Sequence, residues 1–190
     1  MKTISAITLV ALITSLPVFA AKTYPLSSAE GIVTFTASGT PGNFKINGTT
    51  EKKTSVVSGN LVQEGNTLRL ESSFELGQLD TGIGLRTSHM KDKYLEVAKF
   101  PKATLKINLL SFKAGQENSA LPFQGELELH GVKKSIPGTL TVKQMNDSLA
   151  MICDFSVNLT DFAIEIPSFA GVTVNNQVPI QVEIKNAKAQ

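Results

Sequence analysis

The sequence predicts an all-β protein whose antiparallel strands form an up-and-down barrel of about eight strands, with one short helix between strands. Three observations support this prediction. Apolar residues recur at every second position through most of the chain, and short turn segments such as 130–131 and 146–147 separate the alternating runs. Between residues 80 and 104 the apolar spacing lengthens to four, which is typical of a helix.

The alternating runs define the predicted strands. In residues 68–76, Leu68, Leu70 and Phe74 fall on one face, and charged residues such as Arg69 fall on the other. Sheets with one apolar and one polar face are characteristically antiparallel. Comparable runs predict eight or nine strands in all, the others at residues 32–37, 44–50, 55–62, 104–109, 123–130, 139–143, 151–160 and 177–185.

A barrel and a two-layer sandwich both fit these strands. We favour the barrel because closure removes exposed sheet edges, and because the apolar face is similar from strand to strand. About eight strands leave an interior that holds either side chains or one small ligand. The alternation is compatible with a packed interior and with a hollow one.

The helix is predicted over residues 87–97. Met90, Tyr94 and Leu95 have helical spacing, and the hydroxyls at 87–88 are suited to an N-cap. The Phe-Pro pair at 100–101 should end the helix, because proline lacks an amide donor and restricts the preceding residue. We expect the three apolar side chains to face the barrel interior, so that the helix forms a lid or rim.

The N-terminus has the features of an export signal over residues 1–20. A basic residue precedes an apolar run, and Val18 and Ala20 occupy the small-residue positions before a predicted cleavage site. A membrane anchor is the alternative, but the run is shorter than the ~18 to 20 residues of a spanning helix, and Pro17 interrupts it. The sequence predicts a single mature domain, residues 21–190, in the periplasm or secreted.

Charge and cysteine content exclude several classes of function. Without Lys2, the 18 basic residues become 17, against 16 acidic residues, so neither nucleic acid nor an anionic surface is a general partner. Cys153 is the only cysteine, so no internal disulfide forms. It shares an apolar face with Met151 and Phe155, which predicts a buried, inert thiol. We expect no metal and no cofactor.

No residue pattern indicates catalysis. His89 and His130 are the only histidines, and neither has metal-ligand spacing or a clustered carboxylate pair nearby in the sequence. We interpret His89 as a surface or helix-cap residue and His130 as a residue on the polar side of its strand, at a turn. The protein is therefore predicted not to be an enzyme.

The helical segment is rich in cations. Arg86, Lys91 and Lys93 belong to a group of five basic residues between positions 86 and 102, where only two residues are acidic. One interpretation is a cationic rim that meets the polar end of an amphiphile. The alternative is a solvated helix face that keeps the protein soluble.

Several segments, taken in order, resemble the YceI-like family of exported polyisoprenoid-binding proteins. They are Gly59-Asn60-Leu61, Asp80-Thr81-Gly82, Lys91-Asp92-Lys93-Tyr94-Leu95, Phe100-Pro101-Lys102-Ala103-Thr104, the run from Gly125 to Lys134, and Asp161-Phe162-Ala163-Ile164. The last segment has Ala163 where the family pattern usually has glycine, and Leu105 stands where it usually has an aromatic residue.

The resemblance implies a lipocalin-like barrel that holds an isoprenoid chain, such as a polyprenyl lipid or an isoprenoid quinone, for carriage, storage or sequestration. Its partner is then a hydrophobic or amphiphilic small molecule, with transient membrane contact. The different-class alternative is a non-catalytic envelope stress or interaction protein whose barrel is filled by its own side chains. The residues expected to face the ligand are Phe74, Leu76, Met90, Tyr94, Leu95, Leu105, Ile107, Phe123, Leu127, Leu140, Phe155, Phe162, Ile180 and Val182.

Overall fold

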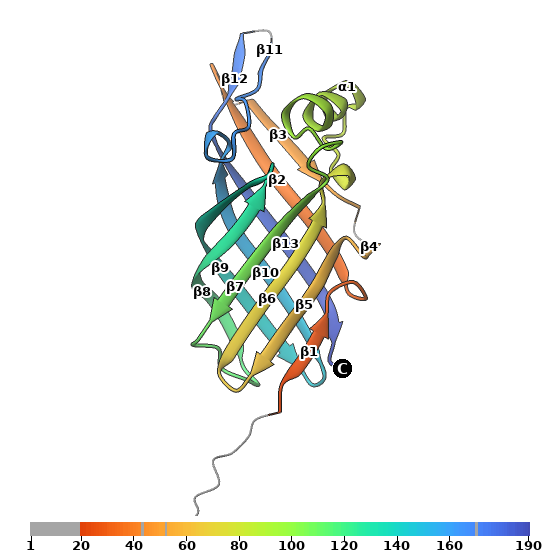
Figure 1. The fold of residues 1–190 in the computed structure, drawn as a ribbon, viewed down its shortest axis with the longest axis vertical. Helices are drawn as coiled ribbons and strands as arrows, with labels where there is room; N and C mark the ends of the chain where they lie inside the picture. The colour runs from red at the N-terminus through yellow and green to blue at the C-terminus, as the bar shows by residue number, and fades with distance from the viewer. Residues whose placement is uncertain (1–19, 43, 52, 170) are drawn as a thin grey trace, which may run out of the picture.

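A computed structural model describes residues 20–42, 44–51, 53–169 and 171–190. The predicted export signal at residues 1–20 lies outside these residues, apart from Ala20. Thirteen strands form one antiparallel sheet that curves around an interior (Figure 1). The strands are β1 (Lys22–Pro25), β2 (Glu30–Thr40), β3 (Phe44–Thr49), β4 (Lys53–Thr54), β5 (Val57–Glu64), β6 (Thr67–Glu75), β7 (Lys102–Leu109), β8 (Glu117–Leu129), β9 (Val132–Met145), β10 (Ser148–Asn158), β11 (Ser168–Phe169), β12 (Val172–Val174) and β13 (Gln177–Lys188).

The antiparallel, all-β prediction is confirmed, whereas the closed barrel of eight strands is not. Strands β5 to β10 are neighbours in chain order, as an up-and-down arrangement requires, and β13 and β2 follow them. The hydrogen-bonded order then runs from β1 at one end to β11 at the other without closing. The unpredicted strands β1, β4, β11 and β12 have only two to four residues, too few for alternation to be recognised.

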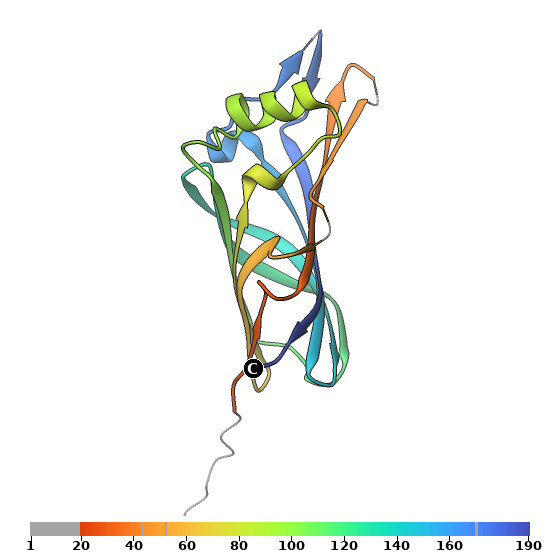
Figure 2. The ribbon, with the colours of Figure 1, turned by 90° about the vertical axis from the view of Figure 1, so that its right-hand side faces the viewer.

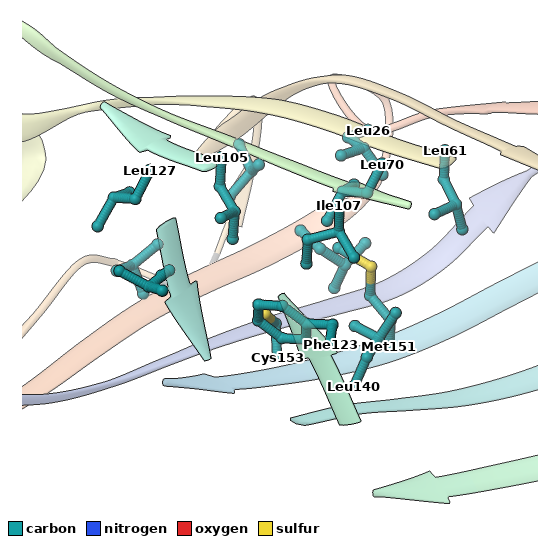
Figure 3. Packing of buried hydrophobic residues seen from close by; sticks show 14 of the residues in the cluster. Leu26, Leu61, Leu70, Leu105, Ile107, Phe123, Leu127, Leu140, Met151 and Cys153 are labelled. Atoms are coloured by element: carbon teal, nitrogen blue, oxygen red, sulfur yellow. The ribbon is translucent and has the colours of Figure 1, made fainter. Parts of the chain in front are cut away.

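One end of the interior is filled by packed side chains. Tyr24 and Leu26, which lie in and just after β1, are fully buried, as is Phe112 in the β7–β8 connection. The Tyr24 hydroxyl donates to Gln63 Oε1 at 3.3 Å and accepts from Gln144 Nε2 at 3.2 Å, so the buried phenol has polar partners. Figure 3 shows side chains from opposite strands converging in the core, among them Leu61, Ile107 and Leu140. This packing closes the end of the sheet where β1 lies.

A helical segment lies across the opposite end (Figure 2). It consists of α1 (Gly84–His89) and a π-helical turn over Met90–Tyr94. Two 3₁₀ turns, Leu76–Gln78 and Leu159–Phe162, were not predicted. Among the described residues, no helix is both long and apolar enough to span a membrane. We call residues 80–96, which include α1 and the π-helical turn, the lid.

The predicted helix start was wrong by three residues. The N-cap position is Ile83, which offers no side-chain hydrogen bond. Thr87 lies inside α1, where its hydroxyl donates to Asp80 Oδ1 at 2.8 Å and accepts from the Thr81 amide at 3.0 Å. The first turn was missed because the start was assigned to the hydroxyl residues at 87–88, whereas the helix begins directly after Ile83 without a side-chain cap.

The lid is attached to the sheet at both of its ends. At its start, the backbones of Asp80 and Thr49 exchange two hydrogen bonds of 2.8 Å, which join the lid to the end of β3. At its end, the Glu96 carboxylate lies 3.1 Å from His130 Nε2 in the β8–β9 turn. The lid is therefore held over the sheet by contacts to two different strand pairs.

His130 is buried, in contrast to its predicted position on the polar side of a strand. The residue is 9% exposed, and its ring lies tilted against Phe100 with 4.4 Å between ring centroids. Nδ1 of the ring lies 3.1 Å from the Phe162 carbonyl oxygen. Both ring nitrogens face acceptors, a carbonyl oxygen and the Glu96 carboxylate. His130 therefore connects the end of the lid to the backbone of the Leu159–Phe162 turn.

Glu96 should make the stability of the fold depend on pH. Hydrogen bonds from Lys99 and then His130 hold the pKa of the Glu96 carboxyl below its ordinary value of 4.5. A lowered pKa in the folded state stabilises the protein above the ordinary value, and this stabilisation is lost as the pH falls through the folded-state pKa. We therefore expect Glu96→Gln to destabilise the protein at neutral pH and to cost progressively less in acid. Urea unfolding of both proteins across this pH range tests the prediction, and a constant difference contradicts it.

Ala163 should limit stability through its backbone conformation. It follows the Leu159–Phe162 turn with φ 55° and ψ 26°, the left-handed region that costs an L-residue about 1–2 kcal/mol. Because glycine gains entropy in the unfolded chain, we expect Ala163→Gly to stabilise the protein by a smaller amount, about 0.5–1 kcal/mol. Chemical denaturation measures the change. Asn146→Gly is the matched control, since Asn146 has φ 52° but asparagine tolerates this region, and an equal gain in both variants contradicts the account.

Candidate functional site

A cavity of about 640 Å³ lies between the lid and the packed end of the sheet. Its wall is formed by inward-facing residues of β2, β6, β7, β8, β10 and β13, and its cover by the lid residues Met90, Tyr94 and Leu95. These strands alternate between faces, so every second residue contributes to the wall. The interior is therefore hollow at the lid end and filled at the β1 end.

The boundary between the hollow and the filled part falls between two successive inward-facing residues of each strand, and it is offset between paired strands. Leu70 lines the cavity whereas its cross-strand partner Ile107 does not, and Met151 lines it whereas its partner Ile184 does not. Leu70, Leu105, Met151 and Val182 line the cavity. The next inward-facing residues toward the β1 end are fully buried and lie outside the cavity lining; these are Leu68, Ile107, Leu149 and Ile184. Figure 3 shows Leu105 and Leu127 on one side of this boundary and Ile107 and Leu140 farther along.

The structure places ten of the predicted interior residues in the cavity lining. They are Phe74, Leu76, Met90, Tyr94, Leu95, Leu105, Leu127, Phe155, Ile180 and Val182. Four others, Ile107, Phe123, Leu140 and Phe162, are at most 5% exposed but belong to the packed core instead. Alternation indicates which face a residue occupies, but it does not indicate the depth at which the interior changes from hollow to filled.

Other lining residues were not selected from the sequence. Val33, Phe35 and Ala37 of β2 and Val157 of β10 face the cavity. Alternation within these strands was the available signal. Phe44, Ile83 and Leu85 also line the cavity, at its mouth, and no periodic pattern marks them because they are exposed as well.

Of the three predicted rim cations, only Arg86 lines the cavity. Its Nη2 donates to the Thr81 carbonyl oxygen, and its buried Nε has no hydrogen-bond partner among the described residues. Lys91 and Lys93 lie outside the lining. Lys93 instead lies 3.8 Å from Glu165 Oε2 and 5.0 Å from the centroid of the Tyr94 ring. The excess of basic residues identified a cationic segment, but it did not indicate which cation reaches the interior.

The polar residues of the lining do not form an acid–base pair. No aspartate or glutamate is among the described lining residues, and His89 is the one histidine there. The Ser72 hydroxyl, midway along β6, donates to the Leu105 carbonyl oxygen at 3.2 Å and so has a partner within the sheet. No cluster of three or more potential metal ligands occurs in the described part of the chain. The described lining is thus predominantly apolar, with a few polar groups near the lid and midway along β6.

Cys153 lines the cavity but is only 1% exposed. Burial, and to a smaller extent the Asp154 carboxylate, raises the pKa of its thiol to about 12. The thiolate, which is the nucleophilic form, is therefore scarce at neutral pH. Cys153 thus contributes to the apolar wall, in agreement with the predicted burial.

Two solved structures have a similar fold. One is a polyisoprenoid-binding domain from Saccharophagus degradans implicated in plant cell wall breakdown, with a TM-score of 0.62 and 15% sequence identity; the alignment covers 90% of this chain and 99% of that one. The other is BcnA of Burkholderia cenocepacia, with a TM-score of 0.62 and 13% identity over 81% of this chain and 94% of that one. A comparison with curated proteins found no match.

The sequence itself also matches a family model. The model describes the YceI-like domain and matches residues 18–186, a range that includes every residue of the cavity lining. The match agrees with the resemblance noted in the ordered sequence segments and with the fold shared with the two solved structures. The chain belongs to the YceI-like domain family.

Proposed function

We propose that this protein is a non-enzymatic, exported binding protein that holds the isoprenoid chain of a lipid or quinone in its cavity. The observation that carries the proposal is the apolar cavity of about 640 Å³ beneath the lid. Its volume falls within the ~300–1,000 Å³ typical of small-molecule sites. The solved polyisoprenoid-binding domain, which has the same fold, supports this ligand class.

The lining favours an apolar chain over a polar ligand. Aliphatic and aromatic side chains such as Phe74, Phe155 and Ile180 form most of the wall. Burial of each methylene contributes about 0.8 kcal/mol, so a prenyl chain can bind firmly without directed hydrogen bonds. We assign the ten predicted residues that line the cavity to contact with this chain, and we reassign Ile107, Phe123, Leu140 and Phe162 to the core.

Arg86 would orient the ligand by binding its polar head group. It is the one lysine or arginine among the described lining residues, and it lies on the lid. A guanidinium has only donors, so it favours a head group with acceptor oxygens, such as a quinone carbonyl or a phosphate. In this orientation the head group lies beneath the lid and the tail points toward the packed end.

The alternative of a self-filled barrel describes only one half of the interior. Tyr24, Leu26 and Phe112 fill the β1 end, but the lid end keeps a cavity. The absence of carboxylates from the described lining supports a binding protein over an enzyme. The export signal predicted at residues 1–20 supports a periplasmic or secreted location.

A larger side chain in the cavity should compete with the ligand. Ala37 of β2 lines the cavity and is 7% exposed. The ring in Ala37→Phe should displace about three methylenes of a bound chain, which corresponds to about 2.4 kcal/mol and a roughly 50-fold weaker affinity. Titration with geranylgeraniol and with an isoprenoid quinone measures this change.

Ala150→Phe is the matched control. Ala150 lies in β10, outside the cavity lining, so the same substitution there should leave the affinity unchanged. Circular dichroism of both variants checks that the fold is retained. Equal affinities for the wild-type protein and the folded Ala37→Phe variant would place the ligand elsewhere and refute the proposed site.

A further inference from the structure

Three large apolar side chains are exposed around the mouth of the cavity. Phe44 is 43% exposed, Ile83 is 55% exposed and Leu85 is 66% exposed. The other exposed large apolar residues of the described chain are Leu110, after β7, and Met145, at the end of β9. Figure 2 shows that the β2–β3 hairpin and the lid share one end of the molecule. We call Phe44, Ile83 and Leu85 the mouth patch.

The mouth patch is continuous with the interior. Each of its residues is exposed to solvent and also lines the cavity, although Phe44 begins β3 while Ile83 and Leu85 belong to the lid. A chain that leaves or enters the cavity at this point would therefore stay in contact with apolar atoms. Exposed apolar residues that cluster on one face indicate an interaction surface, whereas isolated ones need no explanation.

Positive charge accompanies the mouth patch. Residues 44–49 and the lid carry the cations Lys45, Arg86, Lys91 and Lys93 against the carboxylates Asp80, Asp92 and Glu96. Of these cations, Arg86 lines the cavity and Lys93 lies 3.8 Å from Glu165 Oε2. The Glu96 carboxylate is directed to Lys99 and His130. The Asp80 carboxylate accepts hydrogen bonds from the Gly82 amide and the Thr87 hydroxyl, so it is directed to its own loop. Apolar side chains flanked by lysine and arginine are the combination that binds the interface of an anionic bilayer.

We propose that the mouth patch docks on the surface of an anionic phospholipid bilayer, so that the ligand passes between bilayer and cavity without crossing water. This inference rests on the proposed lipid-binding function and identifies where that function meets the membrane. Exposure of a long prenyl chain to water is unfavourable in proportion to the apolar area exposed, so passage of the free lipid through solvent has a high barrier. Direct contact between the mouth and the bilayer removes this barrier.

The absence of tryptophan from the chain makes a direct test practical. Leu85→Trp places the sole tryptophan in the mouth patch, and Leu110→Trp places it at an 80% exposed position after β7, away from the lid. Each variant is mixed with phosphatidylcholine vesicles, with and without phosphatidylglycerol, and with vesicles that contain bromine-labelled acyl chains. Tryptophan emission and co-flotation of the protein with vesicles are measured together.

The docking proposal predicts a blue shift, quenching by brominated lipid and co-flotation for Leu85→Trp, all stronger with phosphatidylglycerol. Leu110→Trp should co-float to the same extent without a blue shift or quenching. Leu85→Asp should reduce vesicle binding about tenfold, because a leucine at the interface contributes at least ~1.5 kcal/mol.

Three results would overturn the docking proposal. Equal quenching of both tryptophans would show that the mouth patch lies no closer to the bilayer than the region after β7. Quenching of Leu85→Trp without co-flotation would show that phospholipid is extracted into the cavity, which supports the binding function but not stable docking. If neither variant responds to vesicles while isoprenoid titration still shows binding, the docking proposal fails and the proposed function stands.

Discussion

The structure depends on the apolar inner face of the curved sheet, which encloses more space than its own side chains fill. Every long strand presents apolar residues to the interior, and the curved sheet brings these faces together. At the β1 end, Tyr24, Leu26 and Phe112 complete a close-packed core. At the lid end, the wall encloses a cavity of about 640 Å³. When no ligand occupies this space, its apolar lining either contacts water or lacks van der Waals partners, and both are unfavourable. An apolar ligand removes this cost.

This division explains why the two ends of the molecule are built differently. The packed end supplies stability, since fully buried residues such as Leu140 and Ile184 each contribute about 1.5–3 kcal/mol by leaving water. The lid end has less side-chain packing because it contains the cavity, and hydrogen bonds hold the lid in place there. Asp80 joins the lid to β3, and Glu96 joins it to the β8–β9 turn through His130. The left-handed backbone of Glu96, with φ 43°, lies at the second attachment.

Much of the fold could be predicted from alternation, because a half-buried strand leaves a period of two in the sequence. The antiparallel sheet and the inward side chains of β6, β7, β8, β10 and β13 follow from it. Strand count and closure could not be predicted, since β4 and β11 have two residues each. The depth of the cavity could not be predicted from the sequence either. Leu105 and Ile107 are both aliphatic and both point inward from β7, but only Leu105 lines the cavity. Similarly, the burial of His130 depends on Glu96, Phe100 and Phe162, which come from distant parts of the chain.

If the hollow end is a lipid site and not an imperfectly packed core, the protein purified from its source without detergent stripping should carry its ligand. Native mass spectrometry should then detect one lipid bound per chain, with a mass and fragmentation that identify an isoprenoid tail, and release of that lipid on unfolding. A folded protein that shows only the mass of the bare chain, and that takes up no isoprenoid when one is added, would show that the hollow end is not a lipid site.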